Sequence, residues 1–343
     1  MILVLSNDAD SHTKTVIEKI SRRGHEFVLF DPAKYPYQCK CSIDSRDINS
    51  ASIDVGRKQI FLRTIGAIWV RRPGDFELSA RLQPGESKWL NTECNHLFSS
   101  IWSNLGGFWM SHPDNIRAAS RKLLQLKMAS KLGFEVPEYL VTNNVGRVKA
   151  FLASFKDGVI VKALGAPTVM GDGEAATLYT HHISKKDLRH LNSVAFGPTF
   201  LQKYIQKQAD IRVTVVGDTV FAVSIDSAGV EDAKSDFRRA EAFELPHTPI
   251  RLPIKLKDAC LNLVQSLGLQ FGAIDLLLDD RGNYYFLEIN PNGQWLWIEW
   301  MTGLRIADAI CDRLINADKR ESKSRRGNRN RRCPARVGHL FSG

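Results

Sequence analysis

The sequence predicts an α/β protein, and two stretches carry most of that prediction. The chain opens with a short apolar strand at Ile2–Leu5, a helix over 15–22 closed by Gly24, and a buried strand at Phe27–Phe30. A β-α-β unit of this kind implies a parallel sheet. Near the C-terminal end, the run GAIDLLLDDRGNYYFLEINPNGQW has the pattern of two strands joined by a turn. At 343 residues the chain is long enough for two or three domains.

The remaining elements follow in order along the chain. The run Ser111-His112-Pro113-Asp114 interrupts the pattern of strands and helices, so we expect a domain boundary at residue 112. A strongly apolar helix follows the boundary and ends at Gly133. Before the boundary we expect a hairpin arm over 55–62, a strand at Ala67–Val70, a helix over 84–103 and a strand at Phe108–Met110. After it we expect helices over 116–132, 254–267 and 304–317, and strands at Val159–Lys162, 200–205, 211–216 and 220–225.

The predicted hairpin near the C-terminal end carries a candidate metal site. If its loop runs from Asp280 to Asn283, Asp279 pairs with Tyr284, and the register then puts Asp275 opposite Glu288. Asn290 shares their face because side chains alternate along a strand. Two facing carboxylates repel unless a positive charge lies between them, and Mg²⁺ prefers oxygen ligands. The hairpin therefore predicts a magnesium site, the alternative being a solvated polar face on an edge hairpin.

The net charge of +10 is concentrated at the C-terminal end. Residues 319–343 contain nine Lys or Arg and one acid, a net of +8, which leaves +2 for residues 1–318. The run RESKSRRGNRNRRCPAR has almost no large apolar residues, so we expect a disordered basic tail. We expect this tail to be solvated rather than in contact with an acidic partner or nucleic acid, and we do not expect nucleic acid as a partner. The sequence has no CxxC pair, no secretory leader and no membrane-length apolar run, from which we expect a cytoplasmic protein with no membrane partner.

Other residues suit the binding of a nucleoside triphosphate. Lys162 ends a buried strand beside the stretch 163–176, which contains Gly165, Gly171 and Gly173, although a lysine extending to solvent would look the same. Asp210 and Arg212 lie two residues apart on a strand, so they share a face and suit ribose hydroxyls and anionic oxygens, or a salt bridge within the protein.

The sequence resembles the ATP-grasp superfamily over residues 113–318. The resemblance rests on KLLQLKMASKLGFEVP, VIVKAL, LQKYIQKQADIRVTVVGD and the hairpin run, in that order. Three further segments are similar to segments of the microviridin-type, or graspetide, peptide maturases: WVRRP at 69–73, EINPNGQWLWIE and TGLRIADAI. The resemblance implies an ATP-grasp fold with an N-terminal α/β pre-ATP-grasp domain at 1–112. It further implies a central subdomain with a glycine-rich lid at 113–205 and a C-terminal subdomain with the metal site at 206–318, followed by the tail at 319–343.

The resemblance also implies roles for individual residues. ATP and Mg²⁺ would be bound, and an acidic precursor peptide would be the substrate, with an Asp or Glu side chain joined to a hydroxyl or amine; a homodimer is left open. Asp236 and Arg238 would engage the peptide, although solvated charge is the alternative for that cluster. The residues implied at the ATP site are Lys122 and Lys162 for phosphates, Gln202, Lys203 and Ile205 for adenine, Asp210 for ribose, Arg212 for the γ-phosphate or acyl phosphate, and Asp275, Glu288 and Asn290 for Mg²⁺.

Two other functions stay open on the sequence. One is an ATP-grasp ligase of another substrate class, such as an amino-acid or dipeptide ligase or a ribosomal-protein glutamate ligase. The other is a nucleotide-binding regulator without turnover, against which the presence of Lys162, Asp275, Glu288 and Asn290 counts. Consumption of ATP that depends on a peptide would separate the three.

Overall fold

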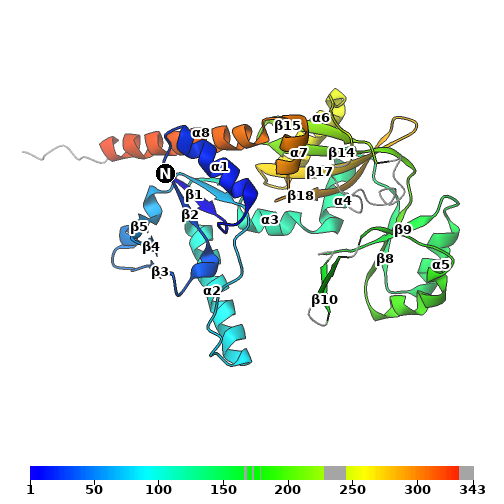
Figure 1. Cartoon of the computed structure of the whole chain (residues 1–343), viewed down its shortest axis with the longest axis horizontal. Helices are drawn as coiled ribbons and strands as arrows, with labels where there is room; N and C mark the ends of the chain where they lie inside the picture. The colour runs from blue at the N-terminus through cyan, green and yellow to red at the C-terminus, as the bar shows by residue number, and fades with distance from the viewer. Residues whose placement is uncertain (166–167, 172–173, 178, 228–244, 332–343) are drawn as a thin grey trace, which may run out of the picture. The chain divides into compact units, whose positions relative to one another are not determined.

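A computed structural model of the chain describes residues 1–165, 168–171, 174–177, 179–227 and 245–331. The chain divides into two compact units (Figure 1). One contains residues 1–112 together with the chain from Ala307, and the other contains residues 113–306. The expected boundary at residue 112 coincides with the division between the units, whereas the expected end of the C-terminal subdomain at residue 318 does not.

The N-terminal unit is built on a parallel sheet, as the β-α-β opening predicts. Helix α1 (Ser11–Arg22) follows the first strand and buries Val16 and Ile20. Its first turn is capped by Asp10, whose side chain accepts a hydrogen bond from the Thr13 backbone N–H at 2.8 Å. The strand order is β2 (Phe27–Phe30), β1 (Ile2–Leu5), β6 (Ala67–Val70) and β7 (Phe108–Met110).

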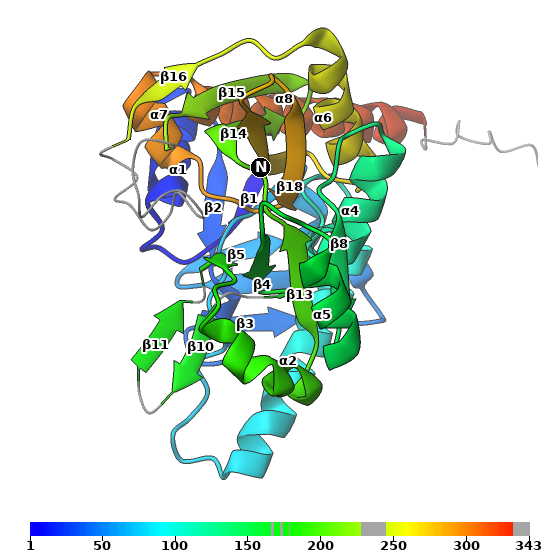
Figure 2. The ribbon, with the colours of Figure 1, turned by 90° about the vertical axis from the view of Figure 1, so that its right-hand side faces the viewer.

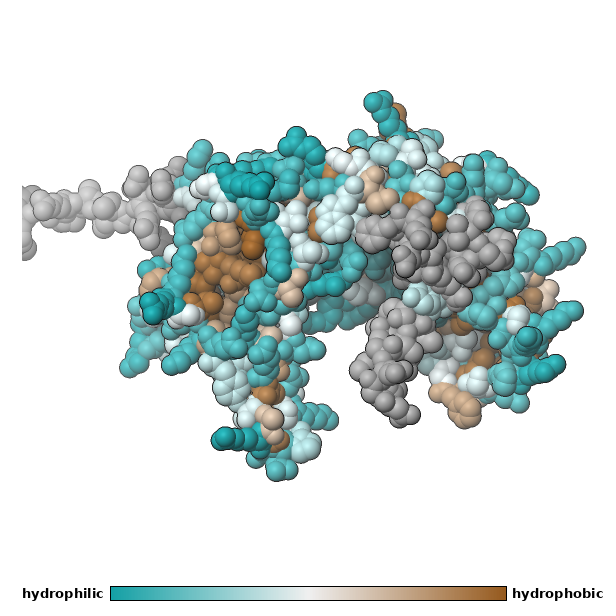
Figure 3. Space-filling model, in the orientation of Figure 1, coloured by the Kyte–Doolittle hydropathy of each residue, from teal (hydrophilic) through white to brown (hydrophobic). Residues whose placement is uncertain are grey.

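An antiparallel sheet and a long helix complete this unit. The expected hairpin arm over 55–62 is part of a sheet of β3 (Cys39–Ser42), β4 (Ser52–Val55) and β5 (Lys58–Phe61). Helix α2 (Pro84–Asn104) places Phe98 among aromatic rings, with Phe76 and Trp102 stacked on it. The same unit has a hollow lined by apolar side chains on the face drawn in Figure 3. Short 3₁₀ helices occupy Pro32–Lys34, Ile48–Ser50 and Leu62–Thr64.

The last helix packs in the N-terminal unit. Helix α8 (Ile306–Arg331) buries Ile310 and Leu314, and Figure 1 shows it alongside α1. Ion pairs hold the two helices together: Arg23 contacts Asp308 and Asp312, each at 2.6 Å. We expected the helix over 304–317 to belong to the C-terminal subdomain; in the structure its residues from Ala307 group with the N-terminal unit, where Asp308 and Asp312 pair with Arg23.

Helix α8 extends past residue 319, where we expected the disordered tail to begin. Helix α8 continues without a break to Arg331. Lys, Arg and Glu have good helix propensity, and extending a helix that packing has already nucleated is far easier than starting one. Side chains at 319–324 are exposed or half-buried, so this extension adds little apolar burial. Residues 332–343 lie outside the described residues.

The second unit begins with two helices where we expected one over 116–132. Helices α3 (Pro113–Ala119) and α4 (Lys122–Lys131) are separated at Arg121, whose backbone is extended with φ −80° and ψ 106°. The Ala119 carbonyl accepts from the side chain of Gln125, so an intrahelical partner is not needed there. Gly133, at φ +84°, follows the second helix as predicted.

Two further sheets complete the second unit, and Figure 2 shows them with the separate hairpin of β10 (Thr168–Gly171) and β11 (Glu174–Thr177). The central sheet has the order β12 (His181–His182), β9 (Val159–Lys162), β13 (Thr199–Lys203) and β8 (Tyr139–Thr142), with α5 (Val145–Ala153) and a 3₁₀ helix at Asp187–Phe196. The C-terminal sheet has the order β16 (His247–Pro249), β15 (Thr219–Ile225), β14 (Lys207–Val216), β17 (Phe271–Asp279) and β18 (Tyr284–Asn290), with α6 (Ile254–Ser266) and α7 (Leu296–Thr302).

A continuous apolar core holds α4 and α6 against the C-terminal sheet. It includes Leu126, Leu263, Ile274 and Phe286, each 2 % exposed or less. One face of β14 and β17 is thereby fixed by packing, and the residues of the opposite face are free to form a polar site. No helix in the described part of the chain has the length and apolar character needed to cross a membrane.

Candidate active site

The hairpin β17–β18 places Asp275 directly opposite Glu288, as predicted. The predicted register at the turn is wrong, because Leu278, and not Asp279, pairs with Tyr284. An irregularity after Asp275 shifts the register by one residue and restores the facing pair. Asp279 organises the turn instead. Burial acts to raise the pKa of its carboxyl, but hydrogen bonds from Asn283 and Arg281 hold that pKa below its ordinary value.

Each of the facing carboxylates is paired with a basic side chain. Arg212 lies opposite Asp275 on β14 and donates to it at 2.6 Å. Lys122, at the start of α4, forms an ion pair with Glu288. The amide of Asn290 donates to Asp275 at 3.2 Å, so all three predicted metal ligands share one face of the hairpin. The repulsion between the carboxylates is thus offset in the structure by a cation on each side.

These residues fit a magnesium site whose shell is completed by other ligands. In the described residues, no group of three or more His, Cys, Asp or Glu side chains is arranged to hold a metal ion. Two carboxylates and an amide are nevertheless the type of donor set that Mg²⁺ uses, because it usually takes one or two protein carboxylates together with water and substrate phosphates.

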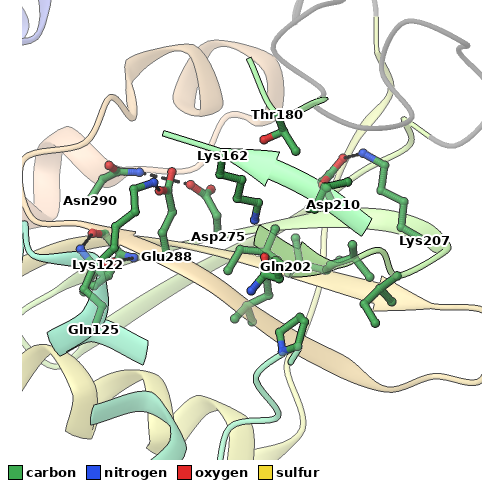
Figure 4. Close-up of a pocket in the computed structure, with 18 of the residues that line it drawn as sticks. Lys122, Gln125, Lys162, Thr180, Gln202, Lys207, Asp210, Asp275, Glu288 and Asn290 are labelled. Carbon is green, nitrogen blue, oxygen red and sulfur yellow. Dashed lines mark hydrogen bonds and ion pairs between the residues drawn. The ribbon is translucent and has the colours of Figure 1, made fainter. Parts of the chain in front are cut away.

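A pocket of about 510 Å³ lies over this hairpin and within the second unit. Figure 4 shows Asp275, Glu288, Asn290 and Lys122 at one end, and Asp210 with Lys207 at the other. The pocket has the size of a small-molecule site. Every residue that the sequence assigned to ATP or Mg²⁺ lines it, namely Lys122, Lys162, Gln202, Lys203, Ile205, Asp210, Arg212, Asp275, Glu288 and Asn290.

Lys162 and Gln202 lie between the two polar ends of the pocket. They come from adjacent strands of the central sheet, where Gln202 pairs with Ile160. The Gln202 side chain is 1 % exposed, and neither its amide nitrogen nor its amide oxygen has a hydrogen-bond partner among the described residues. Leaving a buried amide unpaired is costly. This amide therefore fits a ligand that offers both a donor and an acceptor, as the edge of adenine does.

Asp210 is held by two neighbours that the sequence analysis did not identify. Lys207, on the same strand, forms an ion pair with its carboxylate, and Ser227 donates a hydrogen bond to the same oxygen. The side chain of Lys207 is 5 % exposed. The salt bridge within the protein that we considered for Asp210 and Arg212 is thus present at both residues, but with different partners.

Arg212 is fixed by a backbone contact as well as by Asp275. Its Nη2 donates to the Gln294 carbonyl at 2.7 Å, so the guanidinium bridges β17 and the turn that follows β18. Gly293 makes this approach possible, because a Cβ at that position would lie 2.6 Å from the Ala273 Cβ and 3.1 Å from the Arg212 Nη2.

Two predicted features fall wholly or partly outside the described residues. Asp236 and Arg238, assigned to the peptide substrate, lie in the segment 228–244, which the structure does not describe. The expected lid at 163–176 is described in part: its strands β10 and β11 pair in antiparallel fashion, and Gly165 lines the pocket.

The sequence analysis also missed Gln125 and Thr180, which line the pocket. Gln125 is 3 % exposed and Thr180 is 8 % exposed. The signal for Gln125 was available, since a polar residue at an apolar position of helix 116–132 must find partners if it is buried. Thr180 follows a loop, and nothing in its local sequence distinguishes it.

Two family models match this chain. A family described as RimK-like ATP-grasp domain matches residues 119–314, and one described as MvdD pre-ATP grasp domain matches residues 1–117. Tetrahydromethanopterin:alpha-L-glutamate ligase of Methanocaldococcus jannaschii is 26 % identical over 212 residues, which are 59 % of this chain and 68 % of that protein. Other relatives are matched over smaller parts, such as human N-acetylaspartylglutamate synthase A, of which 32 % is covered.

Solved structures resemble this chain over 92 % of its length. A RiPP-associated ATP-grasp ligase from Chryseobacterium gregarium, in complex with ADP and a leader and core peptide, has a TM-score of 0.86 and 28 % identity over 92 % of this chain and 96 % of its own. The macrocyclase MdnC from Microcystis aeruginosa MRC, bound with the precursor peptide MdnA, has a TM-score of 0.81 and 27 % identity over 92 % and 99 % of the two chains. With its N-terminal pre-ATP-grasp domain, this chain belongs to the RimK-like ATP-grasp family of ATP-dependent ligases.

Proposed function

We propose that this ligase uses ATP to activate a side-chain carboxylate of a ribosomally made precursor peptide as an acyl phosphate, and joins it to a hydroxyl or amine of the same peptide. The observation that carries the proposal is that one pocket is lined by two carboxylates, an asparagine amide, Lys122, Lys162 and Arg212. Such a grouping suits a metal-bound triphosphate and a phosphoryl transfer.

The phosphate end of the pocket is assigned to the metal ligands and the basic residues. Asp275, Glu288 and Asn290 would hold Mg²⁺, which supplies neutralisation of charge on the phosphate oxygens. Lys122 and Lys162 donate to phosphate oxygens. Each lysine is held near the pocket by its element, Lys122 at the start of α4 and Lys162 at the end of β9.

The other end of the pocket is assigned to the nucleoside. The buried amide of Gln202 has a donor and an acceptor to offer to adenine, beside Lys203 and Ile205 on the same lining. Asp210 accepts from ribose hydroxyls. Lys207 and Ser227 hold its carboxylate in place, which lowers the entropy lost when the sugar binds.

Arg212 is assigned to the group that is transferred. A substrate carboxylate oxygen attacks the γ-phosphorus, the bond from that phosphorus to the β–γ bridging oxygen breaks, and ADP leaves. The hydroxyl or amine then attacks the acyl carbon, phosphate leaves, and the nucleophile releases its proton. Arg212 stabilises the charge on the transferring oxygens, because its guanidinium is already fixed by Asp275 and the Gln294 carbonyl.

Support for a peptide substrate comes from the extent of the structural similarity. The ligase from Chryseobacterium gregarium and MdnC match 92 % of this chain, so the similarity includes the N-terminal unit, and both of those proteins are described in complex with peptides. We propose that Asp236 and Arg238 engage an acidic part of the peptide, since an arginine makes charge-assisted contacts with carboxylates.

A second candidate is a ligase that adds glutamate to its substrate. The glutamate ligases of Methanocaldococcus jannaschii and Vibrio atlanticus are 26 % and 22 % identical to this chain over about two thirds of its length or less. The matched RimK-like ATP-grasp domain, residues 119–314, carries the nucleotide chemistry common to both candidates. It does not decide the acceptor.

Release of ADP tests both candidates. The enzyme is incubated with Mg²⁺ and ATP, and with either a peptide encoded by a short acidic, Ser/Thr/Lys-rich reading frame beside the gene or L-glutamate. Peptide-dependent ADP release with loss of one water from the peptide for each crosslink, read by mass spectrometry, is the expected outcome. ADP release with glutamate and a gain in acceptor mass would support the second candidate, and ATP binding without any turnover would support a regulator.

Arg238→Ala tests the peptide assignment separately. We expect peptide modification to fall by more than about 10-fold while nucleotide affinity stays within about 2-fold of the wild type, because loss of a contact to a carboxylate costs roughly 1.5–3 kcal/mol. Asp236→Ala should behave similarly if Asp236 orients the arginine. Equal losses of nucleotide binding and peptide processing would move Arg238 to the ATP site.

A further inference from the structure

Gln125 occupies an unusual place between helix α4 and the metal hairpin. Its side chain is 3 % exposed and makes three hydrogen bonds, all to the backbone. Nε2 donates to the Ile289 carbonyl at 2.8 Å and to the Ala119 carbonyl at 2.7 Å, and Oε1 accepts from the Ile289 N–H at 3.2 Å. The carboxamide therefore contacts both backbone groups of one residue, as a neighbouring strand would.

The strand that receives these bonds is at the edge of its sheet. Strand β18 pairs with β17 on one side, and the sheet order places no further strand beyond it in the described residues. Two backbone N–H groups on its outer edge have partners: that of Phe286 donates to the Glu135 carbonyl at 2.7 Å, and that of Ile289 donates to the Gln125 side chain. An edge strand without such partners leaves backbone groups unpaired and can shift along or away from its neighbour.

Ile289 lies between two of the residues that we assign to the metal. Glu288 and Asn290 are its chain neighbours, and both side chains point to the pocket while Ile289 is 1 % exposed in the core. A displacement of the Ile289 peptide groups would therefore move Glu288 and Asn290 together, relative to Asp275 on the strand that stays in the sheet interior.

Helix α4 contributes a second residue to the candidate metal site, Lys122. Lys122 lies three residues before Gln125, so the two side chains project from one side of α4. Lys122 pairs with the carboxylate of Glu288, while Gln125 holds the backbone next to it. The break between α3 and α4 frees the Ala119 carbonyl, which accepts the second hydrogen of the Gln125 amide.

We propose that Gln125 is a positioning residue for the metal site: its carboxamide fixes the Ile289 backbone and thereby sets the spacing of Glu288 and Asn290 from Asp275. The proposal rests on the proposed function, in which these three residues bind Mg²⁺. Partners that orient metal ligands typically change metal affinity by about 10- to 100-fold when they are removed. A residue that only linked the helix to the sheet would change stability without changing metal affinity.

Two substitutions separate these roles. Gln125→Glu keeps the size and the acceptor for the Ile289 N–H, but it removes the donor and places a carboxylate against the carbonyls of Ala119 and Ile289. Gln125→Met keeps the length and removes all three hydrogen bonds, and it carries the test should the first variant fail to fold. Leu126→Ala is the matched control, because Leu126 is the next residue on α4, is 2 % exposed, packs in the apolar core and is not among the residues that line the pocket.

The experiment is calorimetric titration of the full chain with a non-hydrolysable ATP analogue at a series of Mg²⁺ concentrations, beside a melting curve for each variant. We expect the Mg²⁺ concentration that half-saturates nucleotide binding to rise about 10- to 100-fold in both Gln125 variants. Binding of the analogue without Mg²⁺ should stay within about 2-fold of the wild type, since the hydrogen bonds of Gln125 go to Ala119 and Ile289 and not to the residues assigned to the nucleoside. Leu126→Ala should lower the melting temperature and leave the Mg²⁺ dependence unchanged.

An unchanged Mg²⁺ dependence in a folded Gln125 variant would overturn the proposal and leave the metal site intact. An equal shift in Leu126→Ala would also overturn it, because the effect would then follow from loosening the helix. Binding by the wild type that does not respond to Mg²⁺ would instead contradict the metal assignment in the proposed function, and the positioning role with it.

Discussion

Asp275 lies directly opposite Glu288 on neighbouring strands, and each carboxylate is neutralised from outside the hairpin, by Arg212 and Lys122 respectively. The two basic residues come from β14 and α4, which are distant in sequence from the hairpin. Both acid–base pairs, Asp275 with Arg212 and Glu288 with Lys122, line the open pocket. A bound metal and triphosphate would redistribute these pairs, with the carboxylates turning to the cation and the basic groups to phosphate.

We predict that Glu288→Gln lowers the rate of ATP turnover by at least about 100-fold, because one anionic ligand of the proposed metal is lost while the shape of the site is kept. The melting temperature should change by only a few degrees, since relief of the repulsion with Asp275 is opposed by loss of the partly exposed ion pair with Lys122. Turnover is measured as ADP release and folding by circular dichroism. Asp280→Asn, in the exposed turn of the same hairpin, is the control. Full turnover in Glu288→Gln would remove Glu288 from the metal site.

Gly293→Ala tests the placement of Arg212. The added methyl would lie 2.6 Å from the Ala273 Cβ and 3.1 Å from the Arg212 Nη2, so either the turn or the guanidinium must move. We expect kcat to fall about 10-fold or more with a smaller change in KM for ATP, because Arg212 is assigned to the transferred group rather than to the nucleoside. Gly85→Ala is the control, since a Cβ there meets nothing within 4 Å. An unaffected kcat would show that the turn tolerates the methyl.

The packing of α8 can be tested at two places along the helix. Leu314 is fully buried, so Leu314→Ala should destabilise the protein by about 2–5 kcal/mol. Removal of residues 319–343 should leave ATP turnover unchanged and shift the melting temperature by less than about 2 °C, because buried apolar side chains of the described helix end at Ile315. A large loss of stability on truncation would mean that the extension packs against the protein.

We predict that the free energy of unfolding depends on pH through His12. Burial, followed by the positive charge of Arg71, lowers the pKa of His12 to about 4, although Asp10 acts to raise it. An unfolded histidine titrates near pH 6.5, so between about pH 6.5 and 4 the unfolded chain binds a proton that the folded chain does not. The free energy of unfolding should therefore fall as the pH is lowered through this window, by at most about 1.4 kcal/mol per pH unit.

The measurement is urea unfolding at pH 7 and at pH 5, for the wild type and for His12→Asn. The substitution removes the group whose pKa changes on folding, so the difference in stability between the two pH values should become smaller. An equal difference in both proteins would assign the pH dependence to other groups. Asp10 titrates below this window, because its pKa is lowered despite the opposing effect of burial.

Much of the candidate site could be predicted because its residues follow strand alternation and local turn chemistry. Asp275, Glu288 and Asn290 share a face through the period of two in β17 and β18, whatever the rest of the fold does. The error in the turn register did not matter, since the irregularity after Asp275 compensated for it. The role of Gln125 was not predicted, because it depends on Ile289, a partner far away in the sequence. Lys207 was not predicted although its partner Asp210 is only three residues away, because alternation along a strand does not pair those two positions.

The sequence by itself determined the β-α-β opening, the hairpin with the facing carboxylates and the polar residues at the ends of β9 and β13, because periodicity and turn residues act over a few positions. Only the tertiary structure decided that α8 packs on α1, that helix 116–132 breaks at Arg121, and that Lys122 and Arg212 neutralise the facing carboxylates. These features depend on which surfaces meet after the chain has folded. A buried charge or an apolar helix face is stable with any complementary partner, and local sequence does not specify which one it finds.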